Sequence, residues 1–324
     1  MNLEDAIQLV GEDLKAVEAE MGKNFFSEIS MIPTVSRYLI ASGGKRFRPI
    51  LLLLCARLSG YRGPRAVPLA STIEFIHTAT LLHDDVVDRA HMRRGMASAN
   101  SVWGDGASVL VGDFLFTKSF NLIAEDGSLP ILRLISKATN QLAEGEVMQL
   151  VKKGNPGTRE EDYTFVVIHK TAVLISAACQ IGGILGEAPP ERIRAFADFG
   201  LNVGLAFQLI DDMLDYVADE QVLGKTIGMD LNEGKVTLPL IHALRTCSAE
   251  QRERLAGMIQ DSDRSEEDLA FVLGTVRRCG GIDYTRKRAQ FYADQAKSAL
   301  EAFSSSPEKE ALEVIADYTI RRKK

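Results

Sequence analysis

The 324-residue sequence lacks several features that mark particular classes of protein. Its four cysteines, at positions 55, 179, 247 and 279, include no close pair such as CxxC, and their neighbours are mostly apolar. This pattern is typical of reduced thiols in a protein core, and it disfavours a disulfide framework or a zinc site. We therefore expect a protein of a reducing cytoplasm.

Long apolar runs and a basic leader are also missing. The densest apolar run, Ile50 to Ala56, is far shorter than the roughly 20 residues that a membrane span needs. Residues 1–23 carry acids where a signal or transit peptide carries basic residues, and their apolar spacing is that of an amphipathic helix. We expect a soluble chain without a cleaved leader.

The charge balance argues against a third class, namely proteins that bind nucleic acid or anionic membranes through a broadly basic surface. A formal net charge of −6 argues against broad attraction to nucleic acid or to anionic lipid. An anionic ligand would have to be bound by local clusters of Lys and Arg.

Strict alternation of apolar and polar residues is almost absent, whereas apolar residues recur at intervals of three and four over long windows. This periodicity predicts an all-α fold, and no shift in composition marks a second domain, so we expect a single domain over residues 1–324. Helices are expected over residues 3–21, 27–41, 46–59, 66–92, 107–124, 129–151, 159–186, 189–219, 236–246, 248–260, 265–278, 282–304 and 308–321.

One motif occurs twice. LLHDDVVD ends at Asp88 and QLIDDMLD ends at Asp215, and each is an apolar helix interrupted by Asp-Asp-x-x-Asp. On a helix, Asp84 shares a face with Asp88, and Asp211 shares one with Asp215. Two matched copies in the same setting make chance a poor explanation.

Two carboxylates on one helix face repel each other, and partial burial raises the cost. Three compensating arrangements are open: nearby arginines on a solvated face, a divalent cation, or a pKa shift that neutralises one acid. Calcium sites draw about six to eight oxygens from irregular loops, and zinc sites use Cys or His, so neither suits these helices. Magnesium suits them, because one or two carboxylates commonly hold it together with substrate phosphates.

A phosphate-bearing substrate needs further cations, and the chain supplies them. Arg can grip phosphate through a bidentate fork, Lys acts as a point charge, and glycines let the backbone approach closely. The basic sets are Lys45, Arg46 and Arg48 in GGKRFRP, then Arg93 with Arg94, then Lys170, Lys225 and Lys235.

These residues resemble the motifs of the trans-isoprenyl diphosphate synthases, or polyprenyl synthetases, which elongate an allylic diphosphate with isopentenyl diphosphate. The chain is most similar to the long-chain octaprenyl diphosphate synthases among them. The resemblance covers nearly the whole chain, and it implies a helical bundle of the isoprenoid-synthase type around a central apolar cavity. It rests on GGKRFRP, EFIHTATLLHDDVVDRAHMRRG, GDFLFTKSF, HKTA, FQLIDDMLDY and GKTIGMDLNEGKVTLPL, all in the family's order.

The resemblance also implies roles for individual residues. Asp84 and Asp88 would hold two magnesium ions, and Asp211, supported by Asp215, would hold a third. Asp85 and Asp212 would act behind them as partners of the metal ligands. The residues implied for catalysis are Asp84, Asp88, Asp211 and Lys170.

Two diphosphates would be bound by two basic sets. The residues implied for isopentenyl diphosphate are Lys45, Arg48, His77 and Arg94. Those implied for the allylic diphosphate are Arg93, Lys170, Thr171, Gln208, Lys225 and Lys235. Charge that builds on the leaving diphosphate would be stabilised by the cations and basic side chains, and the site should exclude water from the allylic cation.

Product length should depend on the helix before the first motif. The growing tail is expected to pass Ala79 and Thr80, where short-chain members of the family carry aromatic side chains. Both residues are small, which implies a deep tunnel and a long product. We expect farnesyl diphosphate as starter, an all-trans octaprenyl product and use of that product as a quinone side-chain precursor.

Three alternatives stay open, namely a shorter-chain synthase, a class I terpene cyclase and a non-catalytic helical regulatory subunit. A cyclase should have an Asn/Ser/Glu-type second metal motif, and a regulatory subunit should have eroded aspartates, whereas this chain keeps all six. The resemblance further implies a homodimer packed through helices. Release of a long product would need at most transient membrane contact.

Overall fold

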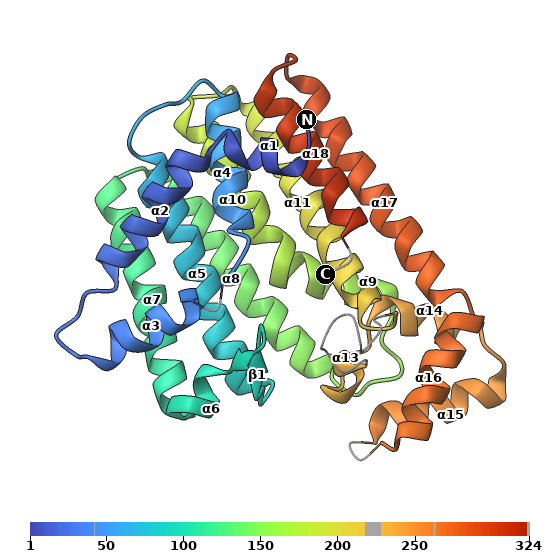
Figure 1. Cartoon of the computed structure of the whole chain (residues 1–324). Helices are drawn as coiled ribbons and strands as arrows, with labels where there is room; N and C mark the ends of the chain where they lie inside the picture. The colour runs from blue at the N-terminus through green and yellow to red at the C-terminus, as the bar shows by residue number, and fades with distance from the viewer. Residues whose placement is uncertain (42, 218–227, 262–263, 323–324) are drawn as a thin grey trace. The chain divides into compact units, whose positions relative to one another are not determined.

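The structure, a computed structural model, describes residues 1–41, 43–217, 228–261 and 264–322, and helices dominate it (Figure 1). The expected all-α class is therefore confirmed. The chain divides into two compact units, each described by itself below, and the expectation of a single domain stays a prediction. Unit 1 contains residues 1–139, 177–197 and 302–312, and unit 2 contains residues 140–176, 198–301 and 313–324.

Unit 1 is formed mainly by the first part of the chain. Its one sheet in the described residues is a two-stranded antiparallel hairpin. The elements are α1 (Leu3–Gln8), α2 (Gly11–Asn24), α3 (Met31–Ala41), α4 (Phe47–Leu58), α5 (Ala66–Val87), β1 (Met92–Arg93), β2 (Met96–Ala97), α6 (Ala99–Trp103) and α7 (Asp105–Asp126).

Unit 2 is formed mainly by the second part. Its elements are α9 (Glu160–Val167), the π-helix η1 (Ile168–Ala172), α13 (Met229–Asn232), α14 (Leu238–Thr246), α15 (Ala249–Gln260), α16 (Glu266–Arg278) and α17 (Gly281–Ala299). Five elements have residues in both units: α8 (Leu129–Lys152), α10 (Val173–Leu185), α11 (Pro190–Leu214), the 3-10 helix η2 (Leu300–Ala302) and α18 (Pro307–Arg321).

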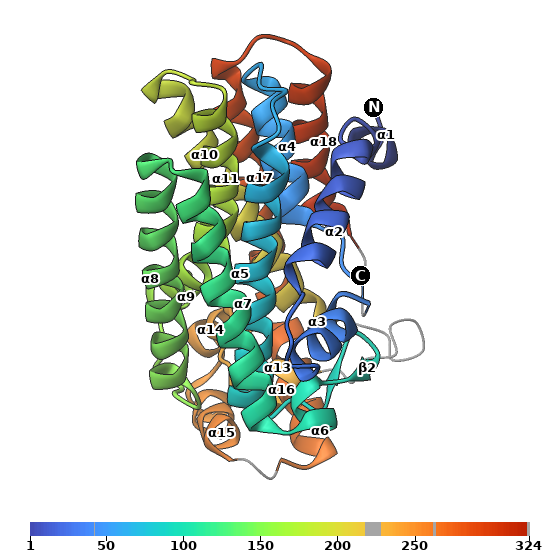
Figure 2. The same ribbon diagram turned by 90° about the vertical axis from the view of Figure 1, so that its left-hand side faces the viewer.

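The core of unit 1 forms around α4 and α5. Residues 50–56 of α4 are all buried, at most 3% exposed, as expected for a helix that is apolar on every side. Helices α5 and α7 lie side by side (Figure 2). They can approach closely because α7 has Gly112 where a Cβ would overlap the His83 ring of α5.

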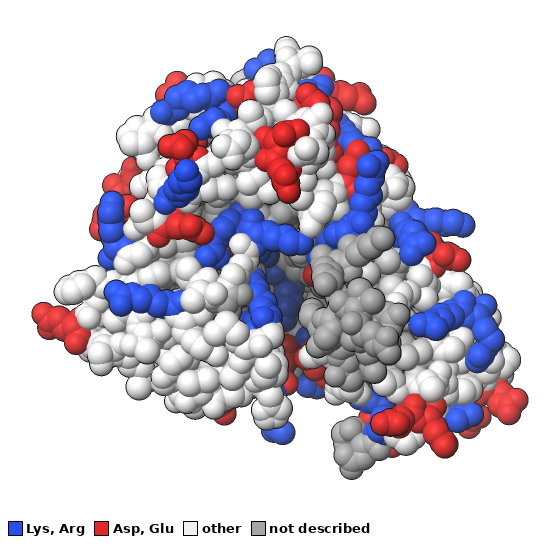
Figure 3. Space-filling model, viewed as in Figure 1, with Lys and Arg blue, Asp and Glu red and all other residues white. Residues whose placement is uncertain are grey.

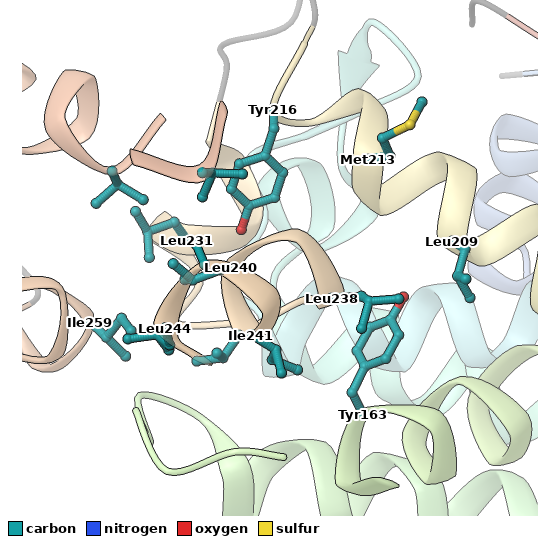
Figure 4. Packing of buried hydrophobic residues seen from close by; sticks show 14 of the residues in the cluster. Tyr163, Leu209, Met213, Tyr216, Leu231, Leu238, Leu240, Ile241, Leu244 and Ile259 are labelled. Atoms are coloured by element: carbon teal, nitrogen blue, oxygen red, sulfur yellow. The ribbon is translucent and has the colours of Figure 1, made fainter. Parts of the chain in front are cut away.

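The core of unit 2 is a cluster of buried apolar residues from α9, η1, α11 and the helices α13 to α17, part of which is drawn in Figure 4. Two of these helices, α15 and α16, begin with capping boxes. The Ser248 side chain accepts a hydrogen bond from the Gln251 amide, and the Gln251 side chain accepts one from the Ser248 amide. Ser265 and Asp268 form the same pair at the start of α16. These caps explain why both helix starts were predictable from sequence.

Several expected helix boundaries are wrong, since the helix expected over 27–41 begins at Met31 and the one expected over 189–219 ends at Leu214. The helix expected over 3–21 breaks at residues 9–10, where Arg57 donates to the carbonyl oxygen of Leu9 and also pairs with Asp13 at 2.8 Å. The helix expected over 66–92 ends at Val87, and Arg89 then takes a left-handed φ of 53°. The chain can therefore turn back and form the short hairpin.

Three helical stretches are long and apolar enough to cross a membrane by length and composition alone. They are Asp105–Asp126, Glu160–Leu185 and Pro190–Leu214, and 39%, 61% and 56% of their most apolar windows are buried inside the structure. Elsewhere on the surface, acidic and basic side chains are interspersed across the described part of the face in Figure 3.

Candidate active site

The first aspartate motif lies at the carboxyl end of α5. Asp84 is in the last turn, Asp88 is the C-cap residue, and the Asp88 amide donates to the Asp84 carbonyl oxygen at 2.8 Å. Both residues are half-buried, whereas Asp85 is fully buried. The helical spacing thus places the outer two aspartates one turn apart and the middle one toward the core.

Asp85 is held by an arginine from the hairpin. Arg93 Nε donates to Asp85 Oδ1 at 2.6 Å, and the Asn100 side chain donates to the Asp85 carbonyl oxygen at 3.2 Å. Burial raises the pKa of Asp85, and the Arg93 charge opposes that rise. The hairpin therefore supplies a cation that keeps this buried carboxylate in place.

An arginine cluster lies in the same unit. It consists of Arg46, Arg48, Arg93 and Arg94, and all but Arg93 interact with a buried acid, Glu74, which is 5% exposed. Arg46 caps α4 with a left-handed φ of 48°, and its Nη1 donates to Glu74 Oε1 at 3.2 Å. Only 11% and 6% of these two side chains are exposed, so the pair is nearly dry.

The electrostatics of this cluster favour an anion. Burial lowers the pKa of Arg48 to about 10. The nearby Glu74 opposes this fall, and the charge of Arg94 adds to it. Burial and then the four arginines hold the pKa of His77 well below its usual range, so this imidazole is neutral near pH 7. Among the described residues, the buried Nε of Arg48 has no hydrogen-bond partner, whereas Arg46 Nε lies 3.6 Å from Glu18 Oε1. A buried donor of this kind suits an anionic ligand.

Close packing of two arginine side chains explains the glycine at position 44 of GGKRFRP. A Cβ on Gly44 would lie 2.9 Å from Nη1 of Arg94 and 3.1 Å from Nη1 of Arg46, and Arg94 also donates to the Gly43 carbonyl oxygen. A larger residue at position 44 would push the two guanidinium groups away. Lys45, between these glycines and Arg46, is exposed.

The two positions expected to set product length lie on α5. Ala79 is completely buried, and Thr80 is half-buried and donates its hydroxyl hydrogen to the His77 carbonyl oxygen at 2.8 Å. The helix turns Ala79 into the core of unit 1, where a larger side chain would have to displace its neighbours.

The second aspartate motif lies at the carboxyl end of α11. Asp211 is the most exposed of its three acids, at 44% of the side chain, and its Oδ1 pairs with Arg322 at 2.7 Å. Arg322 is 6% exposed, stacks over the Phe207 ring at 3.8 Å and donates to the Phe207 carbonyl oxygen at 2.7 Å. A residue near the carboxyl end of the chain therefore supplies the cation that faces Asp211.

The middle aspartate of this motif has neutral partners. Asp212 is 6% exposed, and it accepts hydrogen bonds from the Tyr163 hydroxyl at 2.6 Å and from Gln208 Nε2 at 2.7 Å. Burial raises the pKa of Asp212 to about 6, and both hydrogen bonds oppose the rise. Within the described part of the chain, the charge of this carboxylate is thus supported by two dipoles and by no directly bonded cation.

Asp215 anchors the segment that follows. Its two carboxylate oxygens accept hydrogen bonds from the amides of Met229 and Asp230, both at 3.1 Å, at the start of α13. Asp230 is itself half-buried, and its desolvation together with the nearby Asp212 and Asp215 raises its pKa well above the usual range. Three buried or half-buried acids therefore lie near one another in unit 2.

Lys170 and Thr171 lie on the π-helix η1, a geometry frequently found at functional sites. Two glycines let neighbouring helices pack against it. A Cβ on Gly145 of α8 would lie 2.9 Å from the Lys170 amide nitrogen, and a Cβ on Gly204 of α11 would lie 2.5 Å from Ala172 Cα. Lys170 pairs with Glu146 at 2.8 Å, and Thr171 donates to Gln208 Oε1 at 3.0 Å.

A cavity of about 120 Å³ opens beside these residues in unit 2. Its lining includes Lys152, Lys170, Lys235, Gln208 and Asp212. Each of the three lysines pairs with an acid, at 3.0 Å, 2.8 Å and 2.5 Å respectively. Phosphate oxygens are equivalent partners for these ammonium groups.

The predicted site residues thus fall into two groups. Unit 1 brings Arg48, His77, Arg93 and Arg94 together, with Asp84, Asp88 and Lys45 on the same segments. Unit 2 brings together Lys170, Thr171, Gln208 and Lys235, with Asp211 and Asp215 on α11 and just after it. Lys225 lies outside the described residues.

Sequence reasoning missed four residues that contact these groups. They are Glu74, Tyr163, Asp230 and Arg322. Glu74 had a signal, because an acid inside an otherwise apolar helix needs a partner. Tyr163 and Arg322 had none, since their partners are distant in the sequence.

Comparison with known proteins places the chain in a family. A sequence model described as polyprenyl synthetase matches residues 29–276. Octaprenyl diphosphate synthase of Escherichia coli strain K12 is 45% identical over 322 residues, which cover 99% of each chain. The solved polyprenyl synthase of Caulobacter crescentus CB15, complexed with calcium and isoprenyl diphosphate, is 39% identical with a TM-score of 0.94, over 100% of this chain and 98% of that one.

A solved decaprenyl diphosphate synthase from Rhodobacter capsulatus is equally similar, at 41% identity and a TM-score of 0.95 over 99% of both chains. The chain belongs to the polyprenyl synthetase family. The expected family and fold, and the expected enzyme class of prenyltransferase, are therefore confirmed.

Proposed function

We propose that this chain is an all-trans octaprenyl diphosphate synthase, which condenses isopentenyl diphosphate head-to-tail onto an allylic diphosphate, with farnesyl diphosphate as starter. The observation that carries the proposal is that each aspartate motif has a separate basic group in its own unit, the arginine cluster in unit 1 and the lysine-lined cavity in unit 2. Two basic groups suit two diphosphates. Similarity to the E. coli octaprenyl diphosphate synthase supports the long product.

The arginine cluster suits isopentenyl diphosphate. Arg48 and Arg94, with Lys45 and the neutral His77, would bind its phosphate oxygens, and the buried Nε donor of Arg48 supports this role. A terpene cyclase, which uses one diphosphate substrate, would have no use for such a cluster. The cluster therefore favours a synthase over a cyclase.

The allylic diphosphate would be bound by the other set. Lys170, Thr171 and Gln208 lie along the cavity of unit 2, with Lys235 on the same lining. Arg93 and Lys225 complete the proposed set, and the former also holds Asp85. These ammonium and guanidinium groups would stabilise the charge that grows on the leaving diphosphate.

The cofactor in this proposal is magnesium, with three ions in each active site. Both motifs offer carboxylate oxygens, which suit a hard divalent cation. Asp84 and Asp88 would hold two ions, and Asp211 with Asp215 would hold the third. Bound ions would neutralise the leaving diphosphate. The related structure that contains calcium supports a divalent cation.

The product would serve as a quinone side-chain precursor, made by a cytoplasmic homodimer that contacts membrane only transiently. Apolar side chains support a helical interface between two copies: Val102, Val109 and Leu110 of α6 and α7 are 47%, 36% and 69% exposed. Leu110→Lys should then shift the sedimentation of the protein from dimer toward monomer. Unchanged sedimentation would place the interface elsewhere.

The proposed reaction is tested by incubating the protein with farnesyl diphosphate, labelled isopentenyl diphosphate and magnesium. Octaprenyl diphosphate should form, as chromatography of the labelled products would show. Shorter products would support a shorter-chain synthase. No incorporation by the purified chain alone would support the regulatory-subunit alternative and contradict the proposal.

A further inference from the structure

Tyr163 lies in α9, seven residues before Lys170, and its ring is 6% exposed in the core cluster of unit 2 (Figure 4). Its hydroxyl donates to Asp212 Oδ2 at 2.6 Å, a short bond between two buried groups. The other oxygen, Oδ1, accepts from Gln208 Nε2 at 2.7 Å. Each oxygen of this buried carboxylate therefore has one neutral donor.

The hydrogen bonds continue beyond Asp212. Because Gln208 gives its amide nitrogen to Asp212, its amide oxygen points the other way and accepts from Thr171 Oγ1 at 3.0 Å. Tyr163, Asp212, Gln208 and Thr171 thus form one chain that connects α9, α11 and the π-helix. All four residues line the same cavity as Lys170.

We infer that Tyr163 is a positioning residue for the allylic diphosphate, acting through Asp212 on Gln208 and Thr171; this inference rests on the proposed function. A neutral donor fixes the direction of the Asp212 carboxylate without cancelling its charge. That negative charge remains beside Asp211, where it attracts a divalent cation, while both oxygens of Asp212 stay engaged. An arginine in place of the tyrosine would remove this attraction.

Removal of the hydroxyl has a definite consequence. In Tyr163→Phe the ring still fills the core, but Asp212 Oδ2 loses its donor in a buried place, which is costly. The carboxylate would turn to find another partner, and Gln208 would lose the orientation that presents its oxygen to Thr171. Binding of the allylic substrate should weaken, and binding of isopentenyl diphosphate in unit 1 should not.

The chain contains a matched control. The Tyr284 hydroxyl also donates to a carboxylate, Glu160, at 2.7 Å and 3.0 Å to its two oxygens. This bond also connects to α9, yet it lies outside the chain formed by Asp212 and Gln208. Tyr284→Phe therefore removes a bond of the same chemical kind from the same unit.

The experiment compares wild type, Tyr163→Phe and Tyr284→Phe by calorimetry with farnesyl thiolodiphosphate, an unreactive allylic analogue, in the presence of magnesium. We expect affinity about tenfold weaker in Tyr163→Phe only, the size of effect that partners of metal ligands commonly have. The KM for farnesyl diphosphate should rise by a similar factor, and the KM for isopentenyl diphosphate should stay within about twofold.

A double variant tests the route through Asp212. If Tyr163 acts through this carboxylate, Tyr163→Phe should weaken the analogue no further in an Asp212→Asn background. Full additivity would overturn the inference, and so would unchanged affinity in Tyr163→Phe or equal loss in Tyr284→Phe. A wild-type chain that never incorporates isopentenyl units would overturn the proposed function, and the calorimetry would still decide the role of Tyr163.

Discussion

The two aspartate motifs have the same sequence pattern but different surroundings. In the first, the buried Asp85 pairs with the charged Arg93, which a hairpin brings back to the end of α5. In the second, the buried Asp212 accepts hydrogen bonds from the neutral Tyr163 and Gln208. The buried middle aspartate of each motif therefore has hydrogen-bond donors. The donor is a charged guanidinium in unit 1, whereas the donors in unit 2 are a neutral hydroxyl and a neutral amide.

The wider surroundings differ in the same sense. Unit 1 gathers four arginines around His77, and two buried acids, Glu74 and Asp85, pair with Arg46 and Arg93. Unit 2 gathers Asp212, Asp215 and Asp230, and Lys235 is the described cation that acts on Asp212 and Asp230. The arginine cluster of unit 1 favours an anion, whereas the three acids of unit 2 favour a cation beside the lysine-lined cavity.

The largest expected effect comes from removing a proposed metal ligand from either motif. Asp84→Ala and Asp211→Ala should each lower the steady-state rate by about a thousandfold or more, because charge on the leaving diphosphate would lose its stabilisation. Circular dichroism should show an intact fold in both. A variant that keeps the wild-type rate would show that its motif holds no catalytic metal.

Glu74→Gln tests the arginine cluster. The substitution breaks a nearly dry pair with Arg46 and removes the acid that attracts Arg48 and Arg94, so the free energy of unfolding should fall by about 3 kcal/mol. Denaturant titration measures this loss. Saturating inorganic diphosphate should reduce the difference from wild type, because the anion replaces the missing charge. If diphosphate leaves the difference unchanged, the cluster does not bind it.

Asp212→Asn tests the neutral support in unit 2. The folded-state pKa of Asp212, about 6, is raised above its unfolded value, so the ionised carboxylate costs stability as pH rises through that window. The variant should lose less stability than wild type between pH 4 and pH 7, by on the order of 2 kcal/mol. Thermal unfolding of both proteins across this pH range measures the difference. If stability falls equally with pH in wild type and variant, the pKa of Asp212 is not raised and its support is not limited to neutral donors.

The smallest effect on the rate is expected at the product-length positions in unit 1, where substitutions should change the product instead. Thr80→Phe should shorten the product, because a ring on the half-buried face of α5 would block a growing tail. Ala79→Phe should act likewise but cost about 1 to 3 kcal/mol, since its site is fully buried. Chromatography of labelled products measures the length. Octaprenyl products from both variants would place the tunnel elsewhere.

Much of the fold was predictable because its signals are local. Helical periodicity covers long stretches of the chain, and Ser248 and Ser265 mark helix starts by their capping boxes. The π-helix at Lys170 was not predictable, since it depends on the close approach that Gly145 and Gly204 allow. The hairpin was missed for a similar reason, because residues 89–97 turn back toward Asp85 only in the folded chain.

The sequence by itself determined the helical class, the two carboxylate pairs and most of the basic residues, because spacing on a helix follows from its fixed geometry. Only the tertiary structure decided what holds each middle aspartate. Arg93 is eight residues from Asp85, whereas Tyr163 is 49 residues from Asp212. Burial, hydrogen-bond partners and shifted pKa values arise when distant segments pack together, and no local pattern records that packing.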